Sequence, residues 1–170
     1  MGRLLASLCL IAIGLAACGT PTPYAPAPQN GGFGHAVQKL EDARFRVTFA
    51  GNALTDRHTV ENYLLYRAAE LTLERGGDYF VVVTRAIEAD TDYRTSHDSP
   101  PYVGPYRSWR SGFSDPYRGH GTARAITRYD AHAEIIVRSG RKPPDAPAAF
   151  DARAMIRNLG PAIVRAAPPG

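Results

Sequence analysis

Residues 123–138, ARAITRYDAHAEIIVR, make the longest alternating stretch of the chain. Apolar or small side chains occupy the odd-numbered positions, and charged or polar side chains occupy most of the even-numbered ones. This two-residue period is typical of a strand that buries one face and leaves the other in water. The stretch therefore predicts one long or bent strand, and the rest of the fold is expected to surround it.

Shorter patterns along the rest of the chain predict five further elements. We expect a strand hairpin, a main helix that ends at Gly76–Gly77, a β-branched strand covered on both faces, and a short second helix with Pro147 near its start. In chain order these elements span 35–40, 44–50, 59–75, 79–89 and 148–159. The predicted core joins the apolar faces of the sheet and the main helix, through Phe49, Leu64, Ala68, Val82 and Ile135.

The order ββαββα predicts an α+β fold. We expect a single two-layer sandwich, in which two helices cover one face of an antiparallel-rich sheet of about four strands. A chain of 170 residues, of which 44% are hydrophobic, has room for one such domain with an ordinary core. Its 20 basic residues are interspersed with 16 acidic ones and form no basic block, which argues against a nucleic-acid binder.

The N-terminal pattern is typical of a targeting segment. Arg3 gives a basic start, and residues 4–15 form an apolar stretch of signal-peptide length, too short to span a membrane. At its end stands a lipobox, Leu15-Ala16-Ala17-Cys18. This resembles bacterial lipoproteins, and the resemblance implies cleavage before Cys18, a diacylglycerol on its sulfur and an acyl group on its new amine. The alternatives are an ordinary secretory signal and an internal apolar helix with an incidental cysteine.

Lipidation at Cys18 has consequences for the mature chain. Cys9 leaves with the signal peptide and Cys18 becomes a thioether, so we expect no disulfide and no thiol chemistry. Three acyl chains make membrane attachment effectively permanent. Gly19 stands where an inner-membrane retention signal often has Asp, so the resemblance favours the outer membrane, facing the periplasm.

A tether is expected between the anchor and the domain. Residues 18–34 contain four prolines and an Asn-Gly-Gly run, a composition that makes neither helix nor sheet. The interpretation as a spacer is favoured over a proline-rich ligand for an SH3-like domain. The predicted organisation is then a signal peptide over 1–17, an anchor and tether over 18–34, and one domain over 35–166.

The main body also resembles an uncharacterised lipoprotein family of alphaproteobacteria. The resemblance covers most of residues 33–161 and rests on FRVTFAGN at 45–52, YLLYRAAELT at 63–72, FDAR at 150–153 and NLGP at 158–161. It implies an envelope location and a single domain, and it implies no catalytic residue.

The sequence contains no motif for a reaction, a cofactor or a metal. The five histidines have no metal-ligand spacing, and neither a nucleophile elbow nor a phosphate-binding loop occurs. The three residue types of a catalytic triad occur together at Ser96-His97-Asp98, but the side chains of adjacent residues point apart and cannot relay a proton. Glu70 and Glu74 lie one helical turn apart and are suited to hold a cation or to form an acid–base pair, although a solvated helix face has the same spacing.

One segment, residues 96–122, carries a candidate binding site. It is rich in Gly and Pro, and it combines aromatic side chains with arginines, as binding hot spots do. The candidate residues are Tyr102, Tyr106, Arg107, Trp109, Arg110, Phe113, Tyr117 and Arg118. Aromatic faces suit sugar rings and arginines suit acidic groups, so peptidoglycan, lipopolysaccharide or an envelope protein are the expected partners. The alternative is a loop whose aromatics fold onto the sheet.

Together these observations predict a lipid-anchored, periplasm-facing envelope lipoprotein that works as a non-enzymatic binding or assembly module. The alternative is a small envelope hydrolase whose site assembles only in three dimensions. Convergent polar groups in a cleft would favour the hydrolase.

Overall fold

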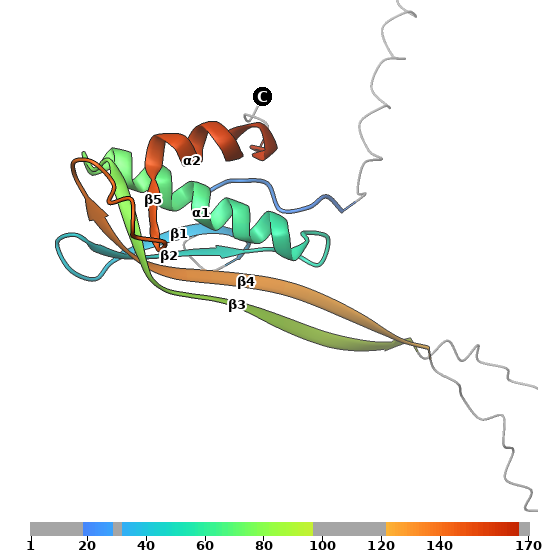
Figure 1. Ribbon diagram of the computed structural model, residues 1–170. Helices are drawn as coiled ribbons and strands as arrows, with labels where there is room; N and C mark the ends of the chain where they lie inside the picture. Colours follow the sequence, from blue (N-terminus) through green and yellow to red (C-terminus); the bar gives the residue numbers. More distant parts are fainter. Residues whose placement is uncertain (1–18, 29–31, 97–121, 167–170) are drawn as a thin grey trace, which may run out of the picture.

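The computed structural model describes residues 19–28, 32–96 and 122–166. The chain forms an α+β fold with one antiparallel sheet, as predicted, and two helices (Figure 1). The elements in chain order are β1 (Gly34–Lys39), β2 (Arg44–Ala50), α1 (Arg57–Glu74), β3 (Tyr79–Ser96), β4 (Thr122–Arg138), β5 (Ala149–Asp151) and α2 (Ala152–Leu159), followed by a 3-10 turn at Gly160–Ala162.

The sheet has five strands in the order β1-β2-β4-β3-β5, which corrects the expected four. The additional strand, β5, lies where the start of the second helix was predicted, and α2 begins only after Asp151 accepts a hydrogen bond from the Ala154 N–H. The prediction that 79–89 is covered on both faces is also wrong. Both helices lie on one side of the sheet (Figure 1), and Val83, Thr84 and Arg85 are exposed.

Both helices lie on the same side of the sheet (Figure 1). Four of the five predicted core residues, Phe49, Leu64, Ala68 and Ile135, are completely buried between α1 and the sheet, and Val82 packs against them half-buried. The alternation along β4 accounts for this, since Ala131, Ala133 and Ile135 face the helix while Glu134 pairs with arginines on the opposite face.

Helix α1 begins and ends with clear capping signals. The Asp56 carboxylate accepts hydrogen bonds from the backbone N–H and the hydroxyl of Thr59, and these bonds hold the pKa of Asp56 below its usual value. At the other end Gly76 has a φ of +74°, and the Gly76 and Gly77 N–H groups donate to Leu73 and Thr72. This Schellman arrangement is why the helix stops at the predicted glycines.

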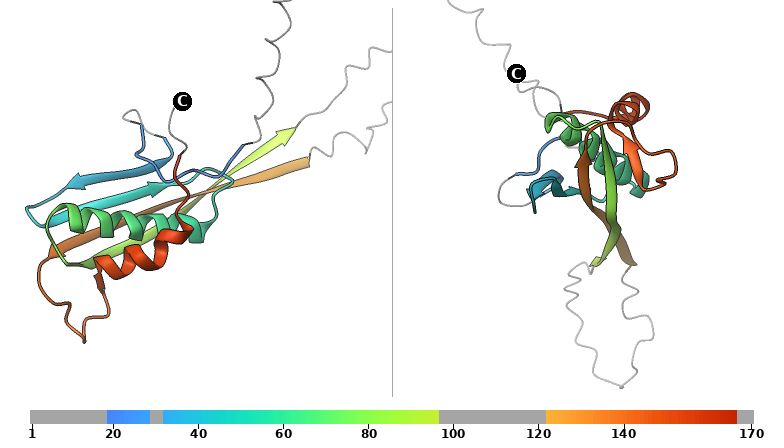
Figure 2. Two further views of the ribbon diagram at one scale, coloured as in Figure 1. Left: turned by 90° about the horizontal axis from the view of Figure 1, so that it is seen from above. Right: turned by 60° about the vertical axis from the view of Figure 1, so that its left-hand side comes forward.

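Strands β3 and β4 extend well beyond the rest of the sheet (Figure 2). β2 ends where Ala50 lies opposite Asp130, yet β3 and β4 remain paired to Ser96 and Thr122. We call Ala89–Ser96 with Thr122–Tyr129 the hairpin arm; it is about 25 Å long at ~3.3 Å per residue. The strand predicted over 79–89 therefore continues to Ser96. A β-bulge between Val82 and Thr84 precedes the arm.

Candidate functional site

Most of the predicted site residues lie outside the described residues. This holds for Cys18, for His97 and for all eight candidate residues of the loop: Tyr102, Tyr106, Arg107, Trp109, Arg110, Phe113, Tyr117 and Arg118. What the structure describes is the place from which each segment leaves the domain. The lipobox cysteine precedes Gly19 directly, and the loop joins the two ends of the hairpin arm.

The N-terminal segment 19–28 packs on the domain, which corrects its predicted role as a free tether. It has no helix or regular strand, as its prolines require, but its backbone pairs with neighbours at single positions. The Ala27 N–H donates to the His35 carbonyl (2.8 Å), and the His35 N–H donates to the Ala25 carbonyl (2.9 Å). Gly34 permits this close approach, because a Cβ there would lie 2.6 Å from the Ala25 oxygen.

Tyr24 is the main anchor of this segment. Its ring is 6% exposed and packs edge-on against Tyr63 and Tyr66 of α1, with centroids 5.5 and 5.3 Å away. Its hydroxyl donates a hydrogen bond to the Glu70 carboxylate. Burial and this carboxylate raise the pKa of Tyr24 well above its usual value, so the hydroxyl stays protonated.

The C-terminal segment completes the same contact. The Tyr24 N–H donates to the Val164 carbonyl (2.7 Å), and the Val164 N–H donates to the Tyr63 hydroxyl (3.0 Å). The Arg165 guanidinium donates to the Tyr66 hydroxyl (3.0 Å). Two segments 140 positions apart in sequence, Tyr24 and Val164, are thereby held side by side on α1.

Glu70 and Glu74 do not form a free carboxylate pair. Arg67 contacts both: its guanidinium lies 3.3 Å from a Glu70 oxygen and binds Glu74 through two bonds of 2.6 and 3.0 Å. Arg67 lowers the pKa of Glu74. Glu74 is therefore paired with Arg67, and Glu70 is contacted by Arg67, by the Tyr24 hydroxyl and by Arg165 at 3.4 Å. Two arginines balance the two carboxylates, so the arrangement favours a structural ion-pair cluster over a cation site.

The described histidines lie apart. His35 stacks on Tyr24 with ring centroids 4.8 Å apart, and burial and Arg67 lower its pKa. His58 lies exposed in the first turn of α1, and His132 lies on the face of β4 that points away from α1. Among the described residues, no group of three His, Cys, Asp or Glu side chains is placed to hold a metal ion.

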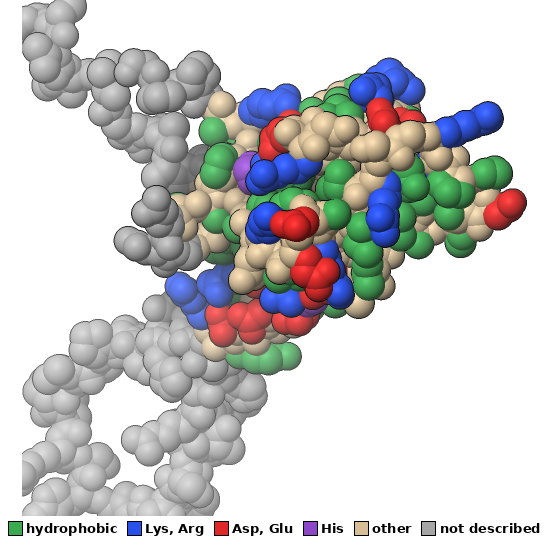
Figure 3. Space-filling view, turned by 90° about the vertical axis from the view of Figure 1, so that its left-hand side faces the viewer, with side chains coloured by type: hydrophobic (Ala, Val, Ile, Leu, Met, Phe, Trp, Pro, Cys, Tyr) green, Lys and Arg blue, Asp and Glu red, His purple; other side chains and the backbone are tan. Residues whose placement is uncertain are grey.

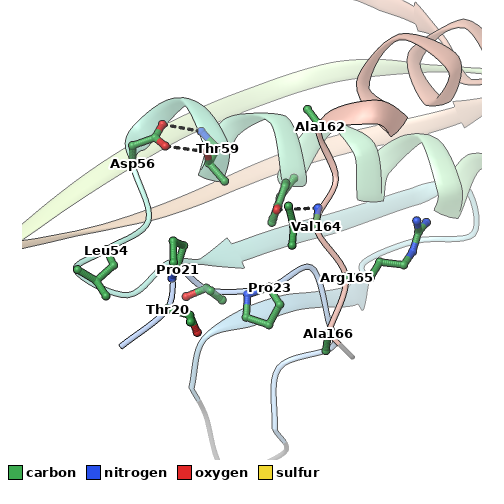
Figure 4. A pocket seen from close by; sticks show the side chains of 12 residues that line it. Thr20, Pro21, Pro23, Leu54, Asp56, Thr59, Ala162, Val164, Arg165 and Ala166 are labelled. Carbon is green, nitrogen blue, oxygen red and sulfur yellow. Dashed lines mark hydrogen bonds between the residues drawn. The ribbon is translucent and has the colours of Figure 1, made fainter. Parts of the chain in front are cut away.

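A groove opens where the two terminal segments meet the start of α1 (Figure 4). We call it the terminal groove; its walls are residues 20–23, residues 54–63 and residues 162–166, and its volume is about 630 Å³. Half of its lining residues are aliphatic, and they present most of the exposed surface: Pro21, Pro23, Leu54, Ala162, Val164 and Ala166. Such a lining suits an apolar ligand or surface.

The polar groups around the groove bind one another. The Thr22 N–H donates to the Thr55 hydroxyl (2.8 Å), and the Thr22 hydroxyl accepts from the Asn52 N–H (2.8 Å). The Asn52 side chain donates to the Thr20 carbonyl (2.7 Å), and Asp56 is occupied as the helix cap. These hydrogen bonds hold the walls of the groove in place. The polar groups would keep their hydrogen bonds if an apolar surface covered the groove.

The hairpin arm carries charge on the face that points away from the helices. Asp90, Asp92 and Arg94 of β3 lie opposite Arg128, Ile126 and Arg124 of β4, and Arg128 pairs with Asp92 at 3.2 Å. Near its base, burial and the carboxylates of Asp90 and Glu88 raise the pKa of Asp130. Towards the tip, Arg94 lies directly opposite Arg124, so the end of the arm is cationic.

The terminal groove was not predicted from the sequence, because its walls come from three distant segments. One signal for it was present: Tyr24 is a large aromatic residue in a stretch that otherwise reads as a spacer. Neither described helix has the length and hydropathy that crossing a membrane requires. A scan against protein-family models matched no family, and searches of curated proteins and of solved structures found no match.

Proposed function

We propose that this protein is a lipid-anchored envelope protein, facing the periplasm, that works by binding a partner through its hairpin arm. The observation that carries the proposal is the arm itself. Eight residue pairs extend beyond β2, and among the described residues no strand pairs with either outer edge of them. An isolated two-stranded ribbon is marginally stable in water, so an arm of this length is best explained by a role at its tip.

The composition around the tip supports this role. Arg94 and Arg124 face each other at the end of the arm, and the segment that joins them adds Arg107, Arg110 and Arg118 together with five aromatic residues. Arginine and aromatic side chains favour acidic groups and sugar rings. Peptidoglycan and lipopolysaccharide provide both kinds of group, and they are the partners we propose.

The test replaces Ser96–Thr122 with Asn-Gly. Thr95 lies opposite Ala123, so a two-residue turn fits the register of the shortened hairpin. We expect a soluble domain that still melts cooperatively but is no longer retained by peptidoglycan or lipopolysaccharide. The matched control replaces the other hairpin turn, Glu41–Ala43, with Asn-Gly, which should leave retention unchanged. Unchanged retention after removal of 96–122 would contradict a binding role for the arm.

The anchor is tested separately with Cys18→Ala. The variant should move from the membrane pellet to the soluble fraction, and the parent should carry the mass of an acylated N-terminal cysteine. If the variant remains in the pellet as fully as the parent, the anchor proposal is wrong.

A further inference from the structure

The folded domain begins immediately after the proposed lipid anchor. Cys18 is bonded to Gly19, and consecutive Cα atoms lie 3.8 Å apart. Gly19 lies against the β2–α1 loop, since a Cβ at this position would be 3.1 Å from the Leu54 Cδ1 atom. From Thr20 onward the chain is hydrogen-bonded to the domain. An acylated Cys18 would therefore have almost no free chain between the lipid and the protein surface.

That surface is the terminal groove and its rim. Leu54 is 56% exposed and Val164 is 67% exposed, and both line the groove together with Pro21 and Pro23 (Figure 4). Large aliphatic side chains that are exposed rarely cluster at one place on a protein surface. By contrast, the end of the molecule where β2 begins has basic and acidic side chains interspersed over much of its surface (Figure 3).

We propose that the terminal groove is a membrane-contact surface, with Leu54 and Val164 lying in the leaflet that holds Cys18. This inference rests on the proposed lipid anchor. Three observations support the lipid as occupant: the position of Gly19 at the groove, the apolar exposed rim, and polar groups that are already bonded to one another. The lipid anchor would then fix the orientation of the domain as well as its location.

The test uses tryptophan as a depth probe in the acylated, full-length protein. The chain has one tryptophan, so Trp109→Phe provides a silent background. Into this background we introduce Leu54→Trp and, as the matched control, Val83→Trp. Val83 is an exposed aliphatic residue of β3, which lies three strands away from β1 in the sheet. Each variant is reconstituted into vesicles whose lipids carry brominated acyl chains.

Bromolipid should quench Leu54→Trp emission at least twofold and leave Val83→Trp emission nearly unchanged. If the acylated protein is bound to the vesicles and bromolipid quenches both variants equally, the proposed orientation is wrong. It is also wrong if bromolipid quenches neither variant. Blue-shifted Leu54→Trp emission without quenching would mean that protein covers the groove, for example a second copy, and would also overturn it. If the parent protein has no acyl group on Cys18, the proposed lipid anchor is wrong, and the proposed orientation is wrong with it.

Discussion

The two halves of the β3–β4 hairpin have the same strand pattern but different surroundings. In the half under α1, the helix-facing residues Ala131 and Ile135 of β4 are 2% and 0% exposed. In the arm, Ala125 continues the same alternation on the same face, yet it is exposed, and its partner Tyr93 is 73% exposed. Alternation thus indicates which side chains share a face, whereas burial depends on whether another layer covers that face.

The sharpest test of this difference compares two isoleucines of β4. Ile135→Ala should lower the free energy of unfolding by about 2–5 kcal/mol, because it opens a cavity under α1. Ile126→Ala, in the arm, should cost less than about 1 kcal/mol, because Ile126 lies on the face that points away from the helices and none of the described elements covers it there. Urea melts of both variants measure the two values. Similar losses at the two positions would mean that the arm is part of the cooperative core.

A smaller effect is expected at Tyr24, where the N-terminal segment joins the core. Tyr24→Phe removes the hydrogen bond to Glu70 and should cost about 1–2 kcal/mol at neutral pH. The raised pKa of Tyr24 also sets a pH dependence. The stabilisation is complete below the unfolded pKa of about 10 and falls as the pH rises above it, because the unfolded tyrosine ionises first.

Urea melts between about pH 8 and 11 check this sign. The stability difference between the parent and Tyr24→Phe should narrow above about pH 10, by up to ~1.4 kcal/mol per pH unit. Tyr93→Phe is the matched tyrosine-to-phenylalanine control, since the Tyr93 ring is mostly exposed. A difference that stays constant with pH would contradict the burial of Tyr24.

The smallest effect is expected for Tyr93→Ala. The side chain is 73% exposed on the arm, so its removal should change the free energy of unfolding by no more than about 0.5 kcal/mol. The same variant sharpens the functional comparison, because a loss of retention by peptidoglycan or lipopolysaccharide at unchanged stability would locate binding on the arm. A stability loss above about 1 kcal/mol would instead show that Tyr93 is covered by protein.

The elements that could be predicted are those with a long, one-sided burial pattern. Val60, Leu64, Ala68 and Leu71 recur at helical spacing in the sequence, and all four are buried in α1. β5 has only three residues, too few for a period, and its strand conformation depends on pairing with the start of β3. Residues 90–96 include Asp90 and Asp92, which disfavour strands, so their pairing with β4 outweighs local propensity.

The terminal groove shows the other limit of prediction. Prolines correctly indicated that residues 19–28 form no helix or regular strand, but local composition contains no information about packing against α1. The contacts of Tyr24 with Tyr63 and Val164 join positions far apart in the chain. A single sequence indicates such contacts only through a residue that differs from its neighbours, here an aromatic residue among prolines.

The bulge at Val83 has a consequence for the evolution of the arm. Before it, even-numbered residues of β3 such as Val82 face the helices; after it, odd-numbered ones such as Ile87 and Tyr93 do. Thr84 already lies opposite Glu134, so a chain without Val83 would keep all later pairings and lose only the added twist and bend. The direction of the arm thus depends on a single position within the sheet, and it can be re-aimed without changing any residue at the tip.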